Sequence, residues 1–270
     1  MRTPRDARRG IAAVIIGALA LLGPRAEAQT APVTMEWLSW SHFRFTSPGG
    51  KVILTNPFVT NPDSPIKVAD IVKADVILVA DGHGDELGSA DEIAIKTGAK
   101  VLAPGELLRT YFEPRKVPEA QLLRLNPGDR QRLDGITVRG VNSVHGSGTP
   151  DKMYGGPALG FMIQFENGLM VYFAGSTAVT LDMQLWAARY KPDVAILPLS
   201  DRREVEDVVE MVRLLRTENP NLKTIIPHHH RLKPAPGAPT PADLESALKA
   251  AGFPVRLLNP ELSRSYELRK

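Results

Sequence analysis

The chain has 270 residues, of which 43% are hydrophobic and 23% charged, and its formal net charge at pH 7 is +3. This is the composition of a globular protein with one large domain or two small ones. The chain contains no cysteine, which excludes a disulfide framework, a thiolate zinc site and a cysteine nucleophile. Any metal ion must therefore be held by His, Asp or Glu.

The first 28 residues have the pattern of a cleaved signal peptide. Four arginines between positions 2 and 9 precede an apolar run over residues 11–22, and Ala26-Glu27-Ala28 supplies a small-x-small cleavage site. As a helix this run would span about 18 Å, too little for a hydrocarbon core of about 30 Å, so we expect no membrane span after cleavage. We expect an exported protein, periplasmic or secreted, whose mature chain is a single domain over residues 29–270.

The net positive charge of the chain lies in this leader segment. Residues 1–28 contain five arginines and two acidic residues, so the mature chain has a formal charge close to zero. The basic character of the full chain therefore does not indicate an anionic polymer as partner, and we expect no nucleic-acid binding.

The first half of the mature chain reads as strands followed by strand–helix alternation. Short apolar or alternating runs predict strands at 34–38, 42–46, 51–54, 74–80 and 100–103. Residues 89–97 are predicted to form a helix ending at Gly98, and a second helix runs from 104 to about 111.

The second half continues in the same way. Strands are predicted at 136–141, 159–165, 169–174, 193–197 and 223–227, with a helix at about 203–217. The final helix has the clearest signals, with Thr240 as N-cap, Pro241 at the first helical position and Gly252 past its end. The alternation of strands and helices indicates one domain of the α/β class.

The histidines concentrate at the ends of these strands. His83 follows the strand at 74–80, His145 follows the strand at 136–141 within four residues, and residues 228–230 are three histidines after the strand at 223–227. Ligand and metal sites of α/β sheets lie in loops just beyond strand ends. The pattern therefore predicts a shared site at one sheet edge.

Three carboxylates join His83 in the segment Asp-Gly-His-Gly-Asp-Glu at 81–86. If this loop curls around a cation, the alternate residues Asp81, His83 and Asp85 can converge on it. Imidazole and carboxylate ligands suit a divalent ion, zinc first, with manganese or iron as alternatives.

The order of these segments resembles the metallo-β-lactamase superfamily, and more narrowly its lactonase-like branch related to ascorbate-6-phosphate lactonase. The match covers about residues 35–268. Residues 81–86 fall on the family's His-x-His-x-Asp-His metal motif, 174–177 on its Ala-Gly-Asp-Thr turn and 226–229 on its Ile-Pro-x-His segment. The resemblance implies a four-layer αββα sandwich with metal at one edge of the two sheets. The metal ligands that it implies are Asp81, His83, Asp85, Glu86, His145 and His229.

Four positions depart from the family pattern. Asp81 and Glu86 stand where the motif has histidines, and Ser176 stands where the aspartate that bridges two metals is expected. A neutral hydroxyl is a poor ligand, so one ion is favoured over two. Asn56 replaces an aspartate of the Ile-Asp-Pro turn, and we expect its amide to donate a hydrogen bond to Asp81 where an aspartate would repel it.

The resemblance leaves three interpretations open. The first is an exported hydrolase that uses a metal-activated water on an ester, lactone or phosphoester-type small molecule, with Asp85 or Glu86 as general base. The second is a catalytically degenerate binding protein in the periplasm that keeps the fold. The third makes Ser176 a nucleophile served by His145 or His229, which needs a geometry that the family does not supply.

The remaining polar residues have less specific interpretations. His42 is predicted to pack with Trp40, and His228 and His230, if the segment stays extended, point away from His229 to the pocket rim or solvent. Arg202 and Arg203 begin a helix at the predicted site edge, where they either meet an anionic substrate or form a solvated helix start.

Overall fold

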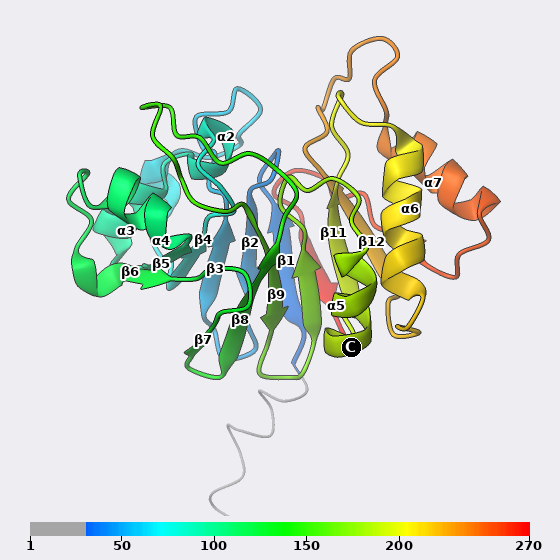
Figure 1. The fold of residues 1–270 in the computed structure, drawn as a ribbon, viewed down its shortest axis with the longest axis horizontal. Coiled ribbons are helices and arrows are strands. Elements are labelled where there is room, and N and C mark those ends of the chain that lie inside the picture. The colour runs from blue at the N-terminus through cyan, green and yellow to red at the C-terminus, as the bar shows by residue number, and fades with distance from the viewer. Residues whose placement is uncertain (1–30) are drawn as a thin grey trace, which may run out of the picture.

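The computed structural model describes residues 31–270, so the predicted signal peptide lies outside the described residues. Two seven-stranded sheets pack face to face, and helices cover the outer face of each sheet (Figure 1). This arrangement confirms the predicted αββα sandwich. Over residues 31–270, every helix is too short or too polar to cross a bilayer.

The first sheet has the strand order β14-β1-β2-β3-β4-β5-β6. Its first four strands pair antiparallel, and the pairs from β3 to β6 are parallel. Its strands are β1 (Val33–Trp37), β2 (Phe43–Thr46), β3 (Val52–Thr55), β4 (Val76–Leu78), β5 (Lys100–Ala103), β6 (Leu122–Arg124) and β14 (Ser265–Leu268).

The second sheet repeats this plan in the order β13-β12-β11-β10-β9-β8-β7. The pairs from β7 to β10 are antiparallel, and those from β10 to β13 are parallel. Its strands are β7 (Arg130–Leu133), β8 (Ile136–Asn142), β9 (Leu159–Gln164), β10 (Met170–Phe173), β11 (Val194–Pro198), β12 (Thr224–His228) and β13 (Arg256–Leu257).

The helices divide between the two outer faces. Those over the first sheet are α2 (Gly84–Leu87), α3 (Ala90–Thr97) and α4 (Gly105–Leu107), with one-turn segments η1 (Val68–Asp70), η2 (Leu108–Phe112) and η3 (Glu119–Gln121). Those over the second sheet are α5 (Asp182–Tyr190), α6 (Val205–Arg216) and α7 (Pro241–Ala250). As predicted, Thr240 caps α7, because its hydroxyl accepts from the backbone N–H of Asp243 and the Asp243 carboxylate accepts from the Thr240 N–H.

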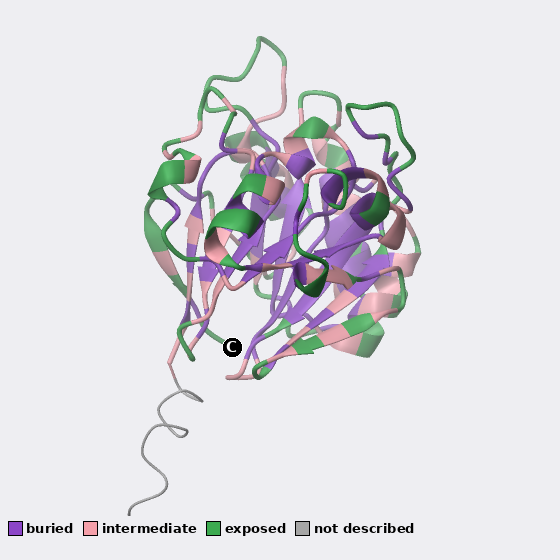
Figure 2. Ribbon diagram, turned by 90° about the vertical axis from the view of Figure 1, so that its left-hand side faces the viewer, coloured by how far each residue is buried: buried purple, intermediate pink, exposed green. Residues whose placement is uncertain are grey.

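The main core lies between the two sheets, where aromatic side chains such as Phe43, Phe45, Phe161 and Phe173 are fully buried (Figure 2). β1 alternates between buried and half-buried residues, whereas every residue of β11 is buried. This is the expected contrast between an antiparallel strand with one covered face and a parallel strand covered on both. Each fully buried large apolar side chain contributes about 1.5–3 kcal/mol to folding, so this core holds the strand ends in fixed positions.

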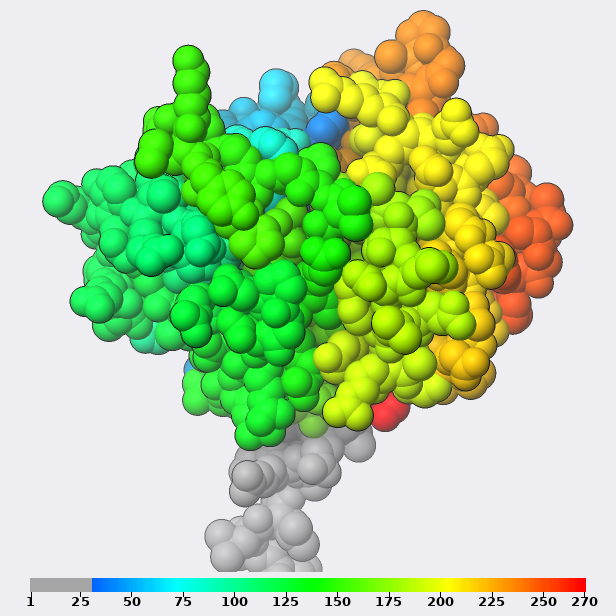
Figure 3. Space-filling view, viewed as in Figure 1, coloured from blue at the N-terminus to red at the C-terminus, as the bar shows by residue number. Residues whose placement is uncertain are grey.

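The loops that carry the predicted site residues all rise from one edge of the sandwich. α2 and the segments that follow β8, β11 and β12 lie together at the top of Figure 1. In the space-filling view the green surface near residue 150 and the yellow surface near residue 200 lie on either side of this edge (Figure 3). The histidines at the strand ends are therefore brought to one edge, as the sequence predicts.

Candidate metal centre

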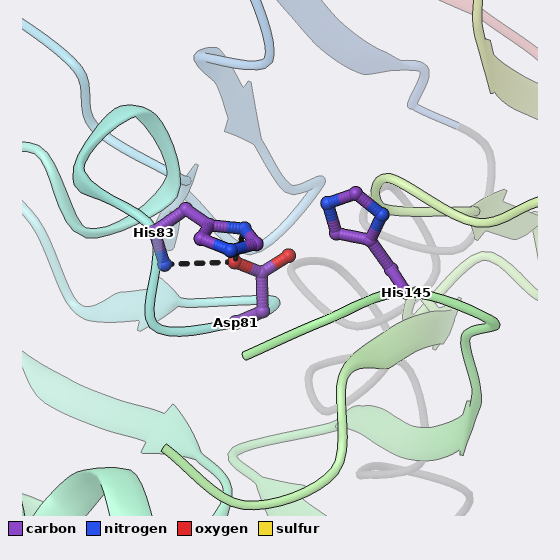
Figure 4. A group of neighbouring side chains, drawn as sticks. All are labelled: Asp81, His83 and His145. Atoms are coloured by element: carbon purple, nitrogen blue, oxygen red, sulfur yellow. Dashed lines mark hydrogen bonds and ion pairs between the residues drawn. The ribbon is translucent and has the colours of Figure 1, made fainter. Parts of the chain in front are cut away.

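Asp81, His83 and His145 form a group that we call the open cluster. Asp81 is fully buried at the end of β4, and its Oδ1 accepts hydrogen bonds from the backbone N–H of His83 at 2.9 Å and from His83 Nδ1 at 3.0 Å. These two contacts orient the His83 ring (Figure 4). They assign the proton to Nδ1 and leave Nε2 as the free ring nitrogen.

His145 completes the open cluster from the loop after β8. Its ring faces that of His83 edge to face, with centroids 5.0 Å apart, and one ligand atom from each of the three residues lies within 4.8 Å of the others. The Asp81 Oδ2 is buried without a hydrogen-bond partner and points toward His145 (Figure 4). A buried carboxylate oxygen without a partner is costly, so a cation between these three donors would satisfy it.

The two imidazoles of the open cluster differ in their protonation. The hydrogen bond to Asp81 is the main cause that raises the pKa of His83 above its ordinary value of 6.5. Partial burial is the main cause that lowers the pKa of His145, and the positive charges of His83 and Arg203 act in the same direction. His145 is therefore the readier neutral ligand, while an ion must displace a proton from His83.

Glu86, Ser176 and His229 form a second group, which we call the closed cluster. The Glu86 Oε1 accepts from the Ser176 hydroxyl at 2.8 Å and lies 2.8 Å from His229 Nε2. The Glu86 Oε2 accepts from the Ser41 hydroxyl at 3.4 Å. All four side chains are buried, and burial raises the pKa of Glu86 although His229 opposes this shift. The polar atoms that could face a second ion are bonded to one another.

A left-handed residue explains where the histidines after β12 point. His229 has φ of 63°, so the segment does not stay extended after His228, where the strand ends. The expectation that His228 and His230 reach the rim or solvent is therefore wrong, because both are buried. His228 packs against Phe43 and Phe173, and its Nδ1 lies 2.7 Å from His229 Nδ1.

The closed cluster does not have the geometry of a serine nucleophile with its base. In a catalytic triad the serine and the carboxylate bond different nitrogens of the histidine ring. Here Ser176 Oγ and Glu86 Oε1 both contact His229 Nε2, at 3.2 Å and 2.8 Å. Since the hydroxyl also donates to Glu86, this geometry gives Ser176 no base of its own.

Asp85 belongs to neither cluster but lies next to the closed cluster, beside an aromatic residue that the sequence did not mark as part of the site. Gly84–Leu87 is a helical turn, so the alternate residues of the loop do not all converge, and the expected approach of Asp85 to Asp81 and His83 is wrong. Its Oδ2 instead accepts from Trp40 Nε1 at 2.9 Å and lies 4.0 Å from His229 Nε2. Trp40 packs at a tilt on His229, with ring centroids 5.3 Å apart.

Asn56 supports the loop in a different way from the one expected. Its Oδ1 accepts from the backbone N–H of Ala80 at 2.9 Å, which ties the end of β3 to the end of β4. Its Nδ2 is buried without a hydrogen-bond partner, so the expected donation to Asp81 is not made. The side chain thus positions the residue before Asp81 rather than Asp81 itself. His42 is fully buried, and burial lowers its pKa to about 3, while the ring that packs on Trp40 is that of His229.

A cavity of about 450 Å³ opens above the two clusters. Of the six implied ligands, four line it together with Ser176, while Asp81 and Glu86 are fully buried and are not among the lining residues. The lining residues are Trp40, His83, Asp85, His145, Ser176, Pro198, Ser200, Asp201, Arg202, Arg203, His229 and Arg231. The structure thus places the two predicted arginines at the cavity and adds Arg231, for which the sequence held no motif.

A family model described as the beta-lactamase superfamily domain matches residues 34–229. The chain belongs to the metallo-β-lactamase superfamily. A UPF0173 metal-dependent hydrolase of Rubrobacter xylanophilus is 34% identical over 229 residues, which cover 82% of this chain and 90% of the relative. A relative of the same name from Archaeoglobus fulgidus is 34% identical over 239 residues, covering 87% and 98%.

A solved structure extends this similarity to the fold. A metallo hydrolase from Ignicoccus hospitalis superposes with a TM-score of 0.72 at 26% identity, covering 88% of this chain and 99% of that one. The aligned regions cover 90%, 98% and 99% of these three proteins, so the similarity spans nearly the whole length of each.

Proposed function

We propose that this protein is a metal-dependent hydrolase that holds one divalent ion at the open cluster and acts on an ester, lactone or phosphoester-type small molecule. The observation that carries the proposal is the contrast between the two clusters. The open cluster leaves Asp81 Oδ2 without a partner beside two imidazoles, whereas Glu86 and His229 satisfy each other. The relatives named as metal-dependent hydrolases support the reaction class.

The donor set of the open cluster fits a divalent metal. Two imidazoles and one carboxylate are a known set of protein ligands for catalytic zinc, and they also suit manganese and iron. Asp81, His83 and His145 would hold the ion. When bound, such an ion supplies Lewis acidity toward a carbonyl or phosphoryl oxygen and lowers the pKa of water.

Asp85 is the better placed of the two predicted general bases. It lines the cavity, its side chain is 36% exposed, and the Trp40 N–H on Oδ2 holds the carboxylate in place. Its Oδ1 can accept a proton from a water molecule in the cavity. Glu86 is fully buried and already accepts from Ser176 and His229, so we assign it to the closed cluster and not to proton transfer.

Metal content and hydrolysis measured on the same sample test this proposal. The chain is purified without a histidine tag, assayed for bound metals, and tested on a p-nitrophenyl ester, a lactone and bis(p-nitrophenyl) phosphate before and after chelation. We expect close to one equivalent of zinc, manganese or iron and a hydrolytic activity that chelation removes and metal restores. His145→Ala is the matched variant, which should lose both. A chain that takes up none of these metals and gains no thermal stability from them would instead support the degenerate binding protein.

We also propose that the chain is exported. The support is the pattern of residues 1–28, a basic start, a short apolar run and a small-x-small site. N-terminal sequencing of the mature protein should find Gln29 at or near its start. Protein that is recovered from the cell envelope fraction with Met1 intact contradicts cleavage.

A further inference from the structure

The cavity wall carries three arginines, and one of them differs from the other two. Arg202 and Arg231 are exposed, and Arg231 Nε lies 3.4 Å from the Asp201 carboxylate. Arg203 is partly buried. Among residues 31–270, no carboxylate lies within 4.0 Å of its guanidinium, since the ion pairs found there do not include it.

Arg203 is held by two hydrogen bonds, one from its backbone N–H to the Ser200 carbonyl at 3.1 Å and one from its guanidinium. Its Nη2 donates to the backbone carbonyl of Ser176 at 2.7 Å. Ser176 follows Gly175, which has φ of 64° and at which a Cβ would lie 2.5 Å from the Leu159 carbonyl oxygen, so no side chain fits there. The guanidinium is therefore anchored to a rigid turn at the edge of the closed cluster, while its other N–H groups remain available to the cavity that it lines.

The Asp207 carboxylate acts on Arg203 but makes no ion pair with it within 4.0 Å. A partly buried guanidinium in this situation is suited to bind an anion. Burial lowers the effective dielectric and strengthens its attraction for an anion, and the planar fork of donors matches the two oxygens of a carboxylate or phosphoryl group. Burial is the main cause that lowers the pKa of Arg203, yet an arginine remains charged at neutral pH. Its charge also contributes to the lowered pKa of His145, so it acts on the open cluster.

We propose that Arg203 is the anion-binding residue of this cavity, where it holds an anionic oxygen of a substrate that bears a carboxylate or phosphoryl group. The proposal rests on the proposed function. In a site with one ion, Arg203 would supply a second fixed positive charge on the side of the closed cluster, where Glu86 and His229 bind each other. With this role for Arg203, the expected substrate is a molecule of the proposed class that also bears a negatively charged carboxylate or phosphoryl group.

Binding of inorganic phosphate to the metal-depleted full chain tests this inference without hydrolysis. Calorimetry compares the wild type with Arg203→Gln, Arg203→Lys and Arg213→Gln. Glutamine can still donate to the Ser176 carbonyl but lacks the charge, and lysine keeps the charge without the fork. Arg213 is the matched control, because it lies on α6 outside the cavity and pairs with Glu210.

We expect Arg203→Gln to weaken phosphate binding about 10- to 100-fold, the range of a charge-assisted hydrogen bond. Arg203→Lys should weaken it less, and Arg213→Gln should leave it unchanged. Thermal melts of each variant establish that it is folded. Equal binding by the wild type and a folded Arg203→Gln, or no binding by the wild type at millimolar phosphate, overturns the inference.

Two further measurements identify the class of anion and distinguish a failure of this inference from a failure of the proposed function. Competition by acetate at similar concentrations assigns a carboxylate, and competition by methylphosphonate alone assigns a phosphoryl group, both at a site that needs Arg203. If phosphate binding needs Arg203 but the metal-loaded chain hydrolyses nothing, the anion site stands and the hydrolase proposal fails. If hydrolysis is found but neither its KM for anionic substrates nor phosphate binding changes in Arg203→Gln, the hydrolase proposal stands and the assignment of Arg203 fails.

Discussion

The open and closed clusters lie at the same sheet edge and use the same kinds of residue, yet they differ in how their polar atoms are satisfied. In the open cluster Asp81 Oδ2 is buried without a partner next to His145. In the closed cluster the carboxylate of Glu86 accepts from both Ser176 and His229. The comparison teaches that histidines and carboxylates indicate a metal site only where their lone pairs are left free.

The two substitutions in the closed cluster depend on each other. Ser176 donates to Glu86 at 2.8 Å, which an aspartate at this position could not do. An aspartate there would bring a second carboxylate against a buried one, and like charges at that distance disfavour ionisation of both. Serine in place of the bridging aspartate is therefore compatible with glutamate in place of the histidine.

The largest expected effect comes from removing a ligand of the open cluster. His83→Ala should lower the affinity for zinc or manganese by at least about 100-fold, because even residues that only support a ligand cost about 10- to 100-fold. Glu86→Gln is the matched change in the closed cluster and should leave the metal content near one equivalent. Elemental analysis after dialysis measures both. If Glu86→Gln loses the metal and His83→Ala retains it, we have assigned the two clusters in the wrong order.

The second prediction concerns the stability of the metal-depleted chain. Glu86→Ala should destabilise the fold by about 3–5 kcal/mol, because it leaves the buried His229 and Ser176 without their acceptor. Asp85→Ala should cost only about 1 kcal/mol, since Asp85 is partly exposed and loses one hydrogen bond to Trp40. Urea unfolding of both variants measures the difference. Equal losses would mean that the buried hydrogen bonds of the closed cluster contribute no more to stability than the partly exposed contact of Asp85.

The third prediction concerns a variant in which the closed cluster should bind a second metal ion. The triple variant with Ser176→Asp, Asp81→His and Glu86→His restores the family's residue types at all three positions. We expect its metal content to rise from about one equivalent toward two, whereas Glu86→His alone should remain near one because Ser176 cannot bridge. Elemental analysis distinguishes the two. A triple variant that folds and still holds one ion would show that further residues close the second site.

Much of the fold could be predicted because its central strands are apolar runs. β4 and β11 are buried along their whole length, and their sequences leave little choice but a covered strand. Four strands were not predicted, and they are the outermost strands of the two sheets: β6, β7, β13 and β14. They are short and mostly polar or exposed; Arg130–Leu133 alternates exposed and half-buried residues, and Arg256–Leu257 is two residues long. α5 was missed as well, since few of its residues are buried.

The site could be predicted only in part, for a related reason. His83 and His145 both follow predicted strands, and ligand sites of α/β sheets lie in loops just beyond strand ends, so their approach could be expected although β8, before His145, pairs antiparallel with its neighbours. The contact of Trp40 with Asp85 joins residues 45 positions apart through a turn in which Ser39 and Trp40 both have positive φ. The left-handed conformation of His229 had no glycine to signal it, so its orientation, and with it the burial of His228, could not be predicted.

The smallest expected effect is on the pH dependence of stability, whose slope should have opposite signs in the metal-depleted and the metal-loaded chain. In the metal-depleted chain the hydrogen bond to Asp81 raises the pKa of His83 above 6.5. A raised pKa means that this pair stabilises the fold fully below pH 6.5 and that the contribution is lost as the pH rises through the raised pKa. The effect is small because the His83 side chain is 40% exposed.

The metal-loaded chain should behave in the opposite way, since an ion binds His83 only after its proton has left. The stabilisation that zinc or manganese confers should therefore increase with pH over the same window, in which the His83–Asp81 contribution of the metal-depleted chain declines. Thermal melts of the wild type and His83→Gln between about pH 5.5 and 8.5, with and without metal, measure both slopes. Because His83→Gln removes the titrating group, its difference from the wild type should fall with pH without metal and rise with pH in its presence. Slopes of the same sign would mean that the ion does not compete with the proton on His83, and the open cluster would then not be the metal site.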